Sequence, residues 1–247
     1  MPFDLTSITS GKKPKPPMGI IYGAGKIGKT TFASQAPNPI FLPTEEGTDF
    51  LDVSRFPIIN SVEELFEAIK TLGTTDHTYK TVVLDSADHL EVLVHEFIVR
   101  KEGVPLEKIN GGYYRWRDAA RIVWRDILNQ LNKLRERKGM GILIIAHFKT
   151  KDVPDPRSDT YSRIMLKLDD SAAAFLCESV DFIGFAGMDI KAVATNDEDR
   201  KRGVATGERK LFLVEQPAFV AGNRMGLPSS IPLSWNAFAE EWMKVTL

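Results

Sequence analysis

The chain has 247 residues, of which 43% are hydrophobic and 26% charged, and its formal net charge is −1. These values fit one large α/β domain, or at most two small ones, and no apolar run approaches the roughly 18 residues that a membrane span needs. The single cysteine, Cys177, excludes an internal disulfide and a cysteine-based zinc site, so we expect a cytoplasmic protein. The near-neutral charge provides no overall attraction to nucleic acid.

The first 17 residues are rich in proline and lysine, which predicts an extended arm over 1–17. Residues 18–247 are expected to form a single domain. It begins with an apolar run over 18–22 that predicts a buried strand, and a segment over 31–36 is compatible with a short helix.

Between this strand and this helix the chain has the pattern G-x-x-x-x-G-K-T of a phosphate-binding P-loop. Its glycines let the backbone turn tightly and point N–H groups at phosphate oxygens, and the helix adds the positive end of its dipole. Lys29 would place its charge on the β- and γ-phosphates, and the Thr30 hydroxyl would complete the Mg²⁺ shell. The alternative is a glycine-rich turn without a ligand, but the full match in this context favours a nucleoside-triphosphate site. The predicted nucleotide-binding residues are Gly23, Ala24, Gly25, Lys26, Ile27, Gly28, Lys29, Thr30 and Thr31.

Two acidic residues follow the next predicted strand, over 40–42. Glu45 and Glu46 come just beyond the carboxyl end of this strand, where open parallel sheets place their ligands. One of them could orient or deprotonate the water that attacks a γ-phosphate. A solvated acidic turn explains the spacing equally well.

A strand over 56–59 and a helix over 61–72, which starts with a capping box, are predicted next. Residues 81–85 then form an apolar run that ends in Asp85. Downstream of a P-loop this pattern favours a Walker B strand, whose acid holds the Mg²⁺ shell. Asp88, one helical turn further on, is either a second acid or the cap of the following helix.

A loop over 103–114 precedes a helix that we expect over 118–137. Aromatic residues alternate with arginines where the two meet, at Tyr113, Tyr114, Arg115, Trp116 and Arg117. Such residues could stack on bases and pair with phosphates, or they could pack against the start of the helix.

A fully apolar strand over 141–147 ends in His147. At the end of a central strand beside the P-loop, a polar side chain can form a hydrogen bond with a γ-phosphate and so report its presence. A purely structural histidine is the alternative, and the position favours the functional interpretation.

The remaining segments carry weaker signals. Residues 151–162 lack periodicity and predict a long mobile loop. Arg224, which follows Gly222 and Asn223, is either a turn residue or a charge aimed at a neighbouring subunit's nucleotide. The other predicted elements are a helix over 168–177, a strand over 180–185, a hydrophilic hairpin tip over 189–207, a strand over 210–214 and a helix over 235–243.

This order of motifs resembles the RecA-like core of P-loop ATPases, and more narrowly the short RecA-like ATPases encoded by bacteriophages, over roughly residues 18–230. The resemblance implies an α/β fold with a mostly parallel central sheet and helices on both faces. It implies ATP and Mg²⁺ as cofactors, with Thr30 and Asp85 at the metal. It also implies catalytic roles for Lys29, for Glu45 rather than Glu46, and for His147 at the position of the γ-phosphate-sensing glutamine.

The stretch Asn223-Arg224-x-Gly226 is similar to the Lys-x-Arg-x-Gly segment of DnaB-type helicases. This similarity implies a homo-oligomer in which Arg224 completes the nucleotide site of the next subunit. Residues 103–117 and 150–166 fall near the two DNA-binding loops of RecA, which implies action on single-stranded DNA in phage recombination or annealing. The alternatives are a helicase or helicase-loading ATPase, a P-loop small-molecule kinase, and a regulator that binds ATP without turnover.

Overall fold

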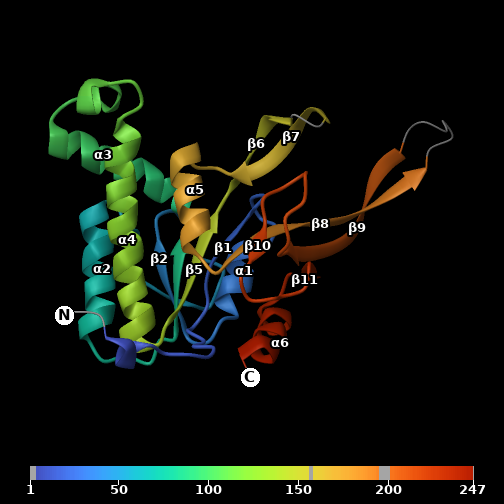
Figure 1. Ribbon diagram of the computed structural model, residues 1–247, viewed down its shortest axis with the longest axis horizontal. Helices are drawn as coiled ribbons and strands as arrows, with labels where there is room; N and C mark the ends of the chain where they lie inside the picture. Colours follow the sequence, from blue (N-terminus) through green and yellow to red (C-terminus); the bar gives the residue numbers. More distant parts are fainter. Residues whose placement is uncertain (1–3, 156–157, 195–200, 247) are drawn as a thin grey trace.

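The computed structural model describes residues 4–155, 158–194 and 201–246, and its centre is a nine-stranded sheet (Figure 1). The strand order is β11-β9-β8-β1-β5-β4-β2-β3, and β10 pairs with β8. Neighbours from β8 to β3 are parallel, whereas β9, β10 and β11 pair in antiparallel fashion. The strands are β1 (Met18–Gly23), β2 (Pro39–Pro43), β3 (Ser54–Arg55), β4 (Thr81–Asp85), β5 (Gly141–Ala146), β8 (Phe182–Ala194), β9 (Lys201–Phe212), β10 (Gly222–Asn223) and β11 (Ser230–Pro232).

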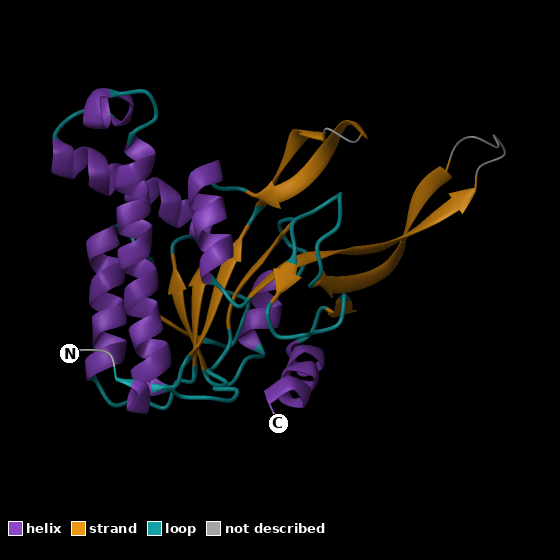
Figure 2. Ribbon diagram, viewed as in Figure 1, coloured by secondary structure: helices purple, strands orange, loops and turns teal. Residues whose placement is uncertain are grey.

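Helices cover both faces of this sheet (Figure 2). On one face lie α2 (Val62–Thr74), α3 (Ala87–Glu102), α4 (Trp116–Lys138) and α5 (Asp170–Ser179). On the other face lie α1 (Lys29–Ser34) and α6 (Trp235–Thr246). The short 3-10 helices η1 (Leu5–Ser7) and η2 (Leu106–Gly111) complete the set. The predicted α/β fold, a mostly parallel sheet between two layers of helices, is confirmed.

The central strands show why the chain folds this way. Every residue of β1, β4 and β5 is buried, as expected for parallel strands covered on both faces. Successive side chains alternate between the two cores: Ile20 and Tyr22 face the α2–α5 layer, whereas Ile21 faces α1 and α6. The unbroken apolar runs therefore supply both hydrophobic cores from one sheet.

The strand predicted over 56–59 is wrong, because the regular ladder there is the two-residue strand β3. The backbone N–H groups of Phe56 and Ile59 still donate to the carbonyls of Phe41 and Pro43, at 3.0 and 2.8 Å. Pro57 has no N–H group to donate between them, so the segment follows β2 through single hydrogen bonds only.

The mobile loop predicted over 151–162 is also wrong. β6 (Phe148–Asp155) and β7 (Ser158–Leu166) form a two-stranded antiparallel hairpin that projects from the carboxyl edge of the sheet (Figure 1). Polar contacts stabilise it, including a 2.6 Å hydrogen bond from the Ser162 hydroxyl to Asp152, so no hydrophobic period marks it in the sequence. Most of the segment predicted as a tip over 189–207 is likewise paired backbone of β8 and β9, and residues 195–200 lie outside the described chain.

The described part of the N-terminal arm, residues 4–17, contains η1 and then follows the base of α4. Arg135 donates its Nε–H to the Pro16 carbonyl at 2.5 Å, and Lys15 forms an ion pair with Glu136 at 2.6 Å. The boundary between an arm over 1–17 and a domain over 18–247 stays a prediction. Within the described residues, none of the helices combines the length and the apolar character that crossing a bilayer requires.

Candidate functional site

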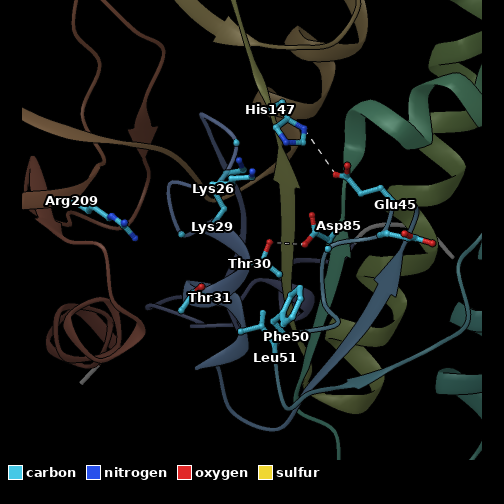
Figure 3. A pocket seen from close by; sticks show the side chains of 14 residues that line it. Lys26, Lys29, Thr30, Thr31, Glu45, Phe50, Leu51, Asp85, His147 and Arg209 are labelled. Carbon is cyan, nitrogen blue, oxygen red and sulfur yellow. Dashed lines mark hydrogen bonds and ion pairs between the residues drawn. The ribbon is translucent and has the colours of Figure 1, made fainter.

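A cavity of about 540 Å³ opens at the carboxyl edge of the parallel strands (Figure 3). β5 lies between β1 and β4, so the loops after these three strands and after β2 meet at one place. The P-loop follows β1, Glu45 follows β2, Asp85 ends β4 and His147 follows β5. The lining residues are Gly25, Lys26, Gly28, Lys29, Thr30, Thr31, Glu45, Glu46, Gly47, Phe50, Leu51, Asp85, His147 and Arg209.

The structure explains why glycine is needed at two of the three glycine positions of the P-loop. A Cβ at Gly23 would lie 2.3 Å from the carbonyl oxygen of Ala186 on β8, so a side chain there would push two paired strands apart. Gly28 has φ of +114°, a left-handed conformation that favours glycine. Gly25 does not have a left-handed φ; Lys26 does instead, with φ of +63°.

Lys29 is buried beneath this loop, with 5% of its surface exposed. Its ammonium group donates to the carbonyls of Gly23 and Ala24 at 3.0 and 2.8 Å. Burial lowers the pKa of Lys29, and the nearby carboxylates of Asp85, Asp88 and Glu45 oppose that shift. The charge is thus held at the floor of the cavity and is balanced by acids around it.

Thr30 and Asp85 form the oxygen pair that the sequence predicted for a metal. The Thr30 hydroxyl donates to Asp85 Oδ2 at 2.9 Å, the lower dashed line in Figure 3. Burial raises the pKa of Asp85 to about 6, although the hydrogen bond from Thr30 lowers it. A hydroxyl and a carboxylate are the hard oxygen donors that Mg²⁺ prefers, and a cation would relieve the cost of this buried charge. The residues present therefore fit Mg²⁺.

Glu45 belongs to a cluster of four polar side chains, together with Ser86, His89 and His147. Glu45 Oε2 lies 3.2 Å from Nδ1 of His89, and Glu45 Oε1 lies 4.0 Å from Nδ1 of His147. The Ser86 hydroxyl is also within 2.9 Å of His89 Nδ1. Glu45, His89 and His147 offer one oxygen and two nitrogens within 4.8 Å of one another, a donor set suited to zinc or another transition metal rather than Mg²⁺.

Asp88 holds His147 of this cluster in place. It accepts from the backbone N–H of His147 at 2.9 Å, and its Oδ2 lies 3.0 Å from His147 Nδ1. Burial opposes ionisation of Asp88, but the bonds from His147 outweigh it, and the pKa of Asp88 is lowered. Neither sequence interpretation of Asp88 describes this: the N-cap of α3 is Ser86, and Asp88 contacts the histidine.

Arg224 does not line this cavity. It is exposed and donates to the carbonyl of Glu178 at the end of α5, while its backbone N–H donates to Asp181 at 2.9 Å. Its neighbour Asn223 holds the turn, because its Oδ1 accepts from the N–H groups of Met225 and Leu227. Arg224 therefore lies outside the cavity of its own chain.

The sequence reasoning missed Arg209, Phe50 and His89 as residues of the site or its border. Arg209 comes from β9, distant in sequence from every motif, and Phe50 from the loop after Glu45. His89 gave no signal other than its place one residue after Asp88.

The segment over 113–117, in which aromatic residues alternate with arginines, was expected either to contact a ligand or to pack against the start of a helix. Its residues do not all behave alike. Trp116 packs edge-on against His95, with ring centroids 4.8 Å apart. Tyr113 and Tyr114 are 94% and 68% exposed, and the Arg117 guanidinium lies 4.8 Å from the centroid of the Tyr114 ring. The two tyrosines are thus the aromatic residues of this segment that remain exposed.

Comparisons with known proteins give a family and two similar proteins. The profile of a family described as "AAA domain" matches residues 15–225. The chain is 26% identical over 132 residues to the SPbeta prophage-derived uncharacterized protein YorG of Bacillus subtilis (strain 168). That alignment covers 51% of this chain and 39% of the relative, so the chain matches well under half of the relative's length. A crystal structure of the RadB recombinase is similar over 80% of both chains, with 15% identity and a TM-score of 0.46.

The predicted resemblance to P-loop ATPases is thereby confirmed at the level of the family, and one relative is prophage-derived. The profile spans the P-loop, both acids at the strand ends, His147 and Arg224. This chain belongs to the AAA domain family.

Proposed function

We propose that this protein binds ATP with Mg²⁺ in the cavity at the P-loop and hydrolyses it to ADP and phosphate. The observation that carries the proposal is that one cavity brings together three chemical groups. They are the ammonium group of Lys29 at its floor, the oxygen pair of Thr30 and Asp85, and the carboxylate of Glu45. A glycine-rich turn without a ligand would not need all three.

The groups that line the cavity have different roles in binding the nucleotide. Backbone N–H groups of the P-loop bind the phosphate oxygens, and Lys29 places its charge between the β- and γ-phosphates. Bound Mg²⁺ would neutralise charge on these phosphates, held by Thr30 and Asp85. Phe50, exposed over its whole surface at the edge of the cavity, offers an aromatic face to the base.

Glu45 orients the attacking water and takes up its proton. The water oxygen then bonds to the γ-phosphorus as the bond to the bridging oxygen of ADP breaks. His147, whose Nδ1 is held by Asp88, donates from Nε2–H to a γ-phosphate oxygen when both of its ring nitrogens carry protons. These roles use only residues that border the cavity or contact one that does.

Binding of Mg²⁺-ATP by calorimetry and phosphate release test this proposal together. The wild-type protein should bind and hydrolyse ATP, and Lys29→Ala should lose both. Lys15→Ala, a change of the same charge on the arm, serves as the control and should match the wild type. Equal binding by Lys29→Ala and the wild type would rule out the P-loop as the site.

We further propose that the protein acts on single-stranded DNA in phage recombination or annealing, as a homo-oligomer with nucleotide sites at its interfaces. Exposed Tyr113 and Tyr114 support this, since bases stack on aromatic side chains without regard to sequence. The prophage origin of a relative supports the phage setting, which would place the protein in the host cytoplasm.

The β6–β7 hairpin supports the DNA proposal less than its sequence suggested. Lys149 and Lys151 both form ion pairs with Asp170, and Arg163 forms one with Glu215. Asp170 offsets one of the two lysine charges and Glu215 offsets the charge of Arg163, so these cations offer less to phosphate groups than three unpaired cations would. The aromatic segment at 113–114 is therefore the better candidate for contact with DNA.

The rate of ATP hydrolysis with and without single-stranded DNA, at two salt concentrations, decides this second proposal. Stimulation that weakens as salt rises would support it, because contacts with phosphates release counterions. Strand displacement by a ring that forms without DNA would favour a helicase or helicase-loading ATPase. Phosphate transfer to a small molecule would favour a kinase, and negligible turnover under all conditions would favour a regulatory switch.

A further inference from the structure

Arg209 forms the wall of the cavity opposite Glu45 (Figure 3). It lies on β9, the strand that pairs with β8 two positions away from the P-loop strand. A Cβ placed on Gly28 would come within 3.5 Å of Arg209 Nη1. The guanidinium therefore lies directly beside the P-loop, and the missing side chain at Gly28 leaves its approach open.

The backbone around Arg209 is fixed on both edges of β9. Arg209 is opposite Met188 on β8, and its carbonyl accepts from the Leu233 N–H at 3.0 Å, just beyond β11. The ladder with β8 shifts register immediately before it, between the pairs Met188–Arg209 and Ile190–Ala205. Gly207, with φ of +85°, lies within that bulge. Bulges re-aim the side chains next to them, and this one sets the direction of Arg209 at the last regular pair.

Within the described side chains Arg209 has no acidic partner, whereas the neighbouring cation, Lys210, has one. Lys210 forms an ion pair with Asp189 at 3.1 Å. Among the residues whose side chains the structure describes (4–6, 8–154, 159–190 and 207–245), none makes a side-chain hydrogen bond or ion pair with the Arg209 guanidinium. A positive charge that borders the cavity and is left without a protein anion suits an anionic ligand.

We propose that Arg209 binds the phosphate chain of the nucleotide from within the same subunit. This inference rests on the proposed ATP site. Lys29 then holds the phosphates from the floor and Arg209 from the side, beside Gly28. A planar guanidinium can donate two parallel hydrogen bonds to phosphate oxygens, which the ammonium of Lys29 cannot do. Arg209 is distinct from Arg224, which lies outside the cavity of its own chain.

Calorimetry with two probes tests the assignment: Mg²⁺-ATP and Mg²⁺-tripolyphosphate, which has the phosphate chain but no nucleoside. Arg209→Gln should weaken binding of both by about tenfold, the loss expected for a charge-assisted hydrogen bond. The affinities of Arg209→Lys should lie between those of Arg209→Gln and the wild type, since lysine keeps the charge but not the planar guanidinium that donates two parallel hydrogen bonds. Lys210→Gln makes the same change in charge at the next residue and should bind both probes like the wild type.

Two results would overturn the proposal while leaving the ATP site intact. Arg209→Gln could bind both probes within about twofold of the wild type, or it could lose affinity for ATP alone, which would move the contact to the nucleoside. If the wild type bound neither probe, or if Lys29→Ala bound both as the wild type does, the ATP site itself would be wrong and this proposal with it. Matching circular dichroism spectra of all variants confirm that each is folded.

Discussion

Asp88 accepts from both the backbone N–H and the imidazole of His147, so one buried carboxylate fixes the end of β5 and the ring that follows it. Its side chain is only 5% exposed, and the hydrogen bonds from His147, the nearest of its partners, offset the cost of its burial. The Nδ1 proton is thereby directed at Asp88, and in the doubly protonated ring the Nε2–H is left to donate to an anionic ligand. A carboxylate thus positions a histidine that borders the phosphate cavity.

Asp88→Asn should lower the turnover of ATP while leaving its binding nearly unchanged. The amide still accepts from the backbone N–H, but it no longer carries the charge that favours a proton on Nδ1. Carboxylates that position histidines elsewhere are worth 10–100-fold, and we expect about tenfold here. Steady-state kcat and KM measure the effect. In a His147→Gln background the glutamine amide supplies an N–H group that does not depend on Asp88. Adding Asp88→Asn to this variant should therefore cause no further loss of turnover. Additive losses in the double variant would contradict the positioning role.

Asp85→Asn should stabilise the protein without nucleotide at pH 8 and abolish its stabilisation by Mg²⁺-ATP. The pKa of Asp85 is raised from 3.8 to about 6, so the native state binds its proton more tightly than the unfolded chain does. The buried carboxylate therefore destabilises the fold as pH rises through this window, by about 3 kcal/mol at most. Urea unfolding at pH 8 and below pH 4 should show the gain of the variant only at pH 8. An equal gain at both pH values would contradict the ionisation argument.

Glu45→Gln should retain ATP binding and lose hydrolysis by roughly 100-fold or more, the usual contribution of a positioned general base. Glu46 borders the same cavity, so Glu46→Gln is a matched control that should hydrolyse ATP normally. The ion-pair distance of 3.2 Å from His89 to Glu45 favours the first of the two glutamates. A normal rate in Glu45→Gln with a lost rate in Glu46→Gln would move the assignment by one residue.

Mixing two inactive variants should restore hydrolysis if Arg224 acts between subunits. Arg224→Ala keeps an intact P-loop but lacks the trans cation, and Lys29→Ala lacks the P-loop charge but supplies Arg224. In a mixed oligomer, the second variant completes the site of the first. Phosphate release by the mixture, compared with each variant alone, measures this, and a mixture as inactive as its components would exclude the trans role.

The sequence predicted those parts of the site that lie at the ends of buried strands. Glu45, Asp85 and His147 each follow an apolar run, and because parallel strands share one carboxyl edge, the fold brings them to the P-loop. Their chemical roles stay predictions. Arg209 and Asp88 could not be placed in this way, since each reaches the site from an element whose position depends on tertiary packing.

The same distinction explains the errors in the fold. Strands that fill the core repeat their apolar pattern locally, and those were found. The β6–β7 hairpin is stabilised by backbone pairing, by the contact between Ser162 and Asp152 and by ion pairs to Asp170 on α5, none of which produces a hydrophobic period. A single Pro57 was enough to interrupt the strand predicted beside β2.

Replacing Tyr113 and Tyr114 by alanine should weaken binding of single-stranded DNA without changing the affinity for ATP. Both rings are exposed, and both residues have left-handed backbone conformations, with φ of +52° and +62°. Stacking on an aromatic ring is worth roughly 1–3 kcal/mol per base, so the double variant should lose at least tenfold in affinity by fluorescence anisotropy. Trp116→Phe, a change in the packed member of the same segment, should bind DNA normally. Because stacking is largely independent of charge, the loss should persist at high salt; a loss seen only at low salt would instead implicate Arg115 and Arg117 as the residues that contact DNA.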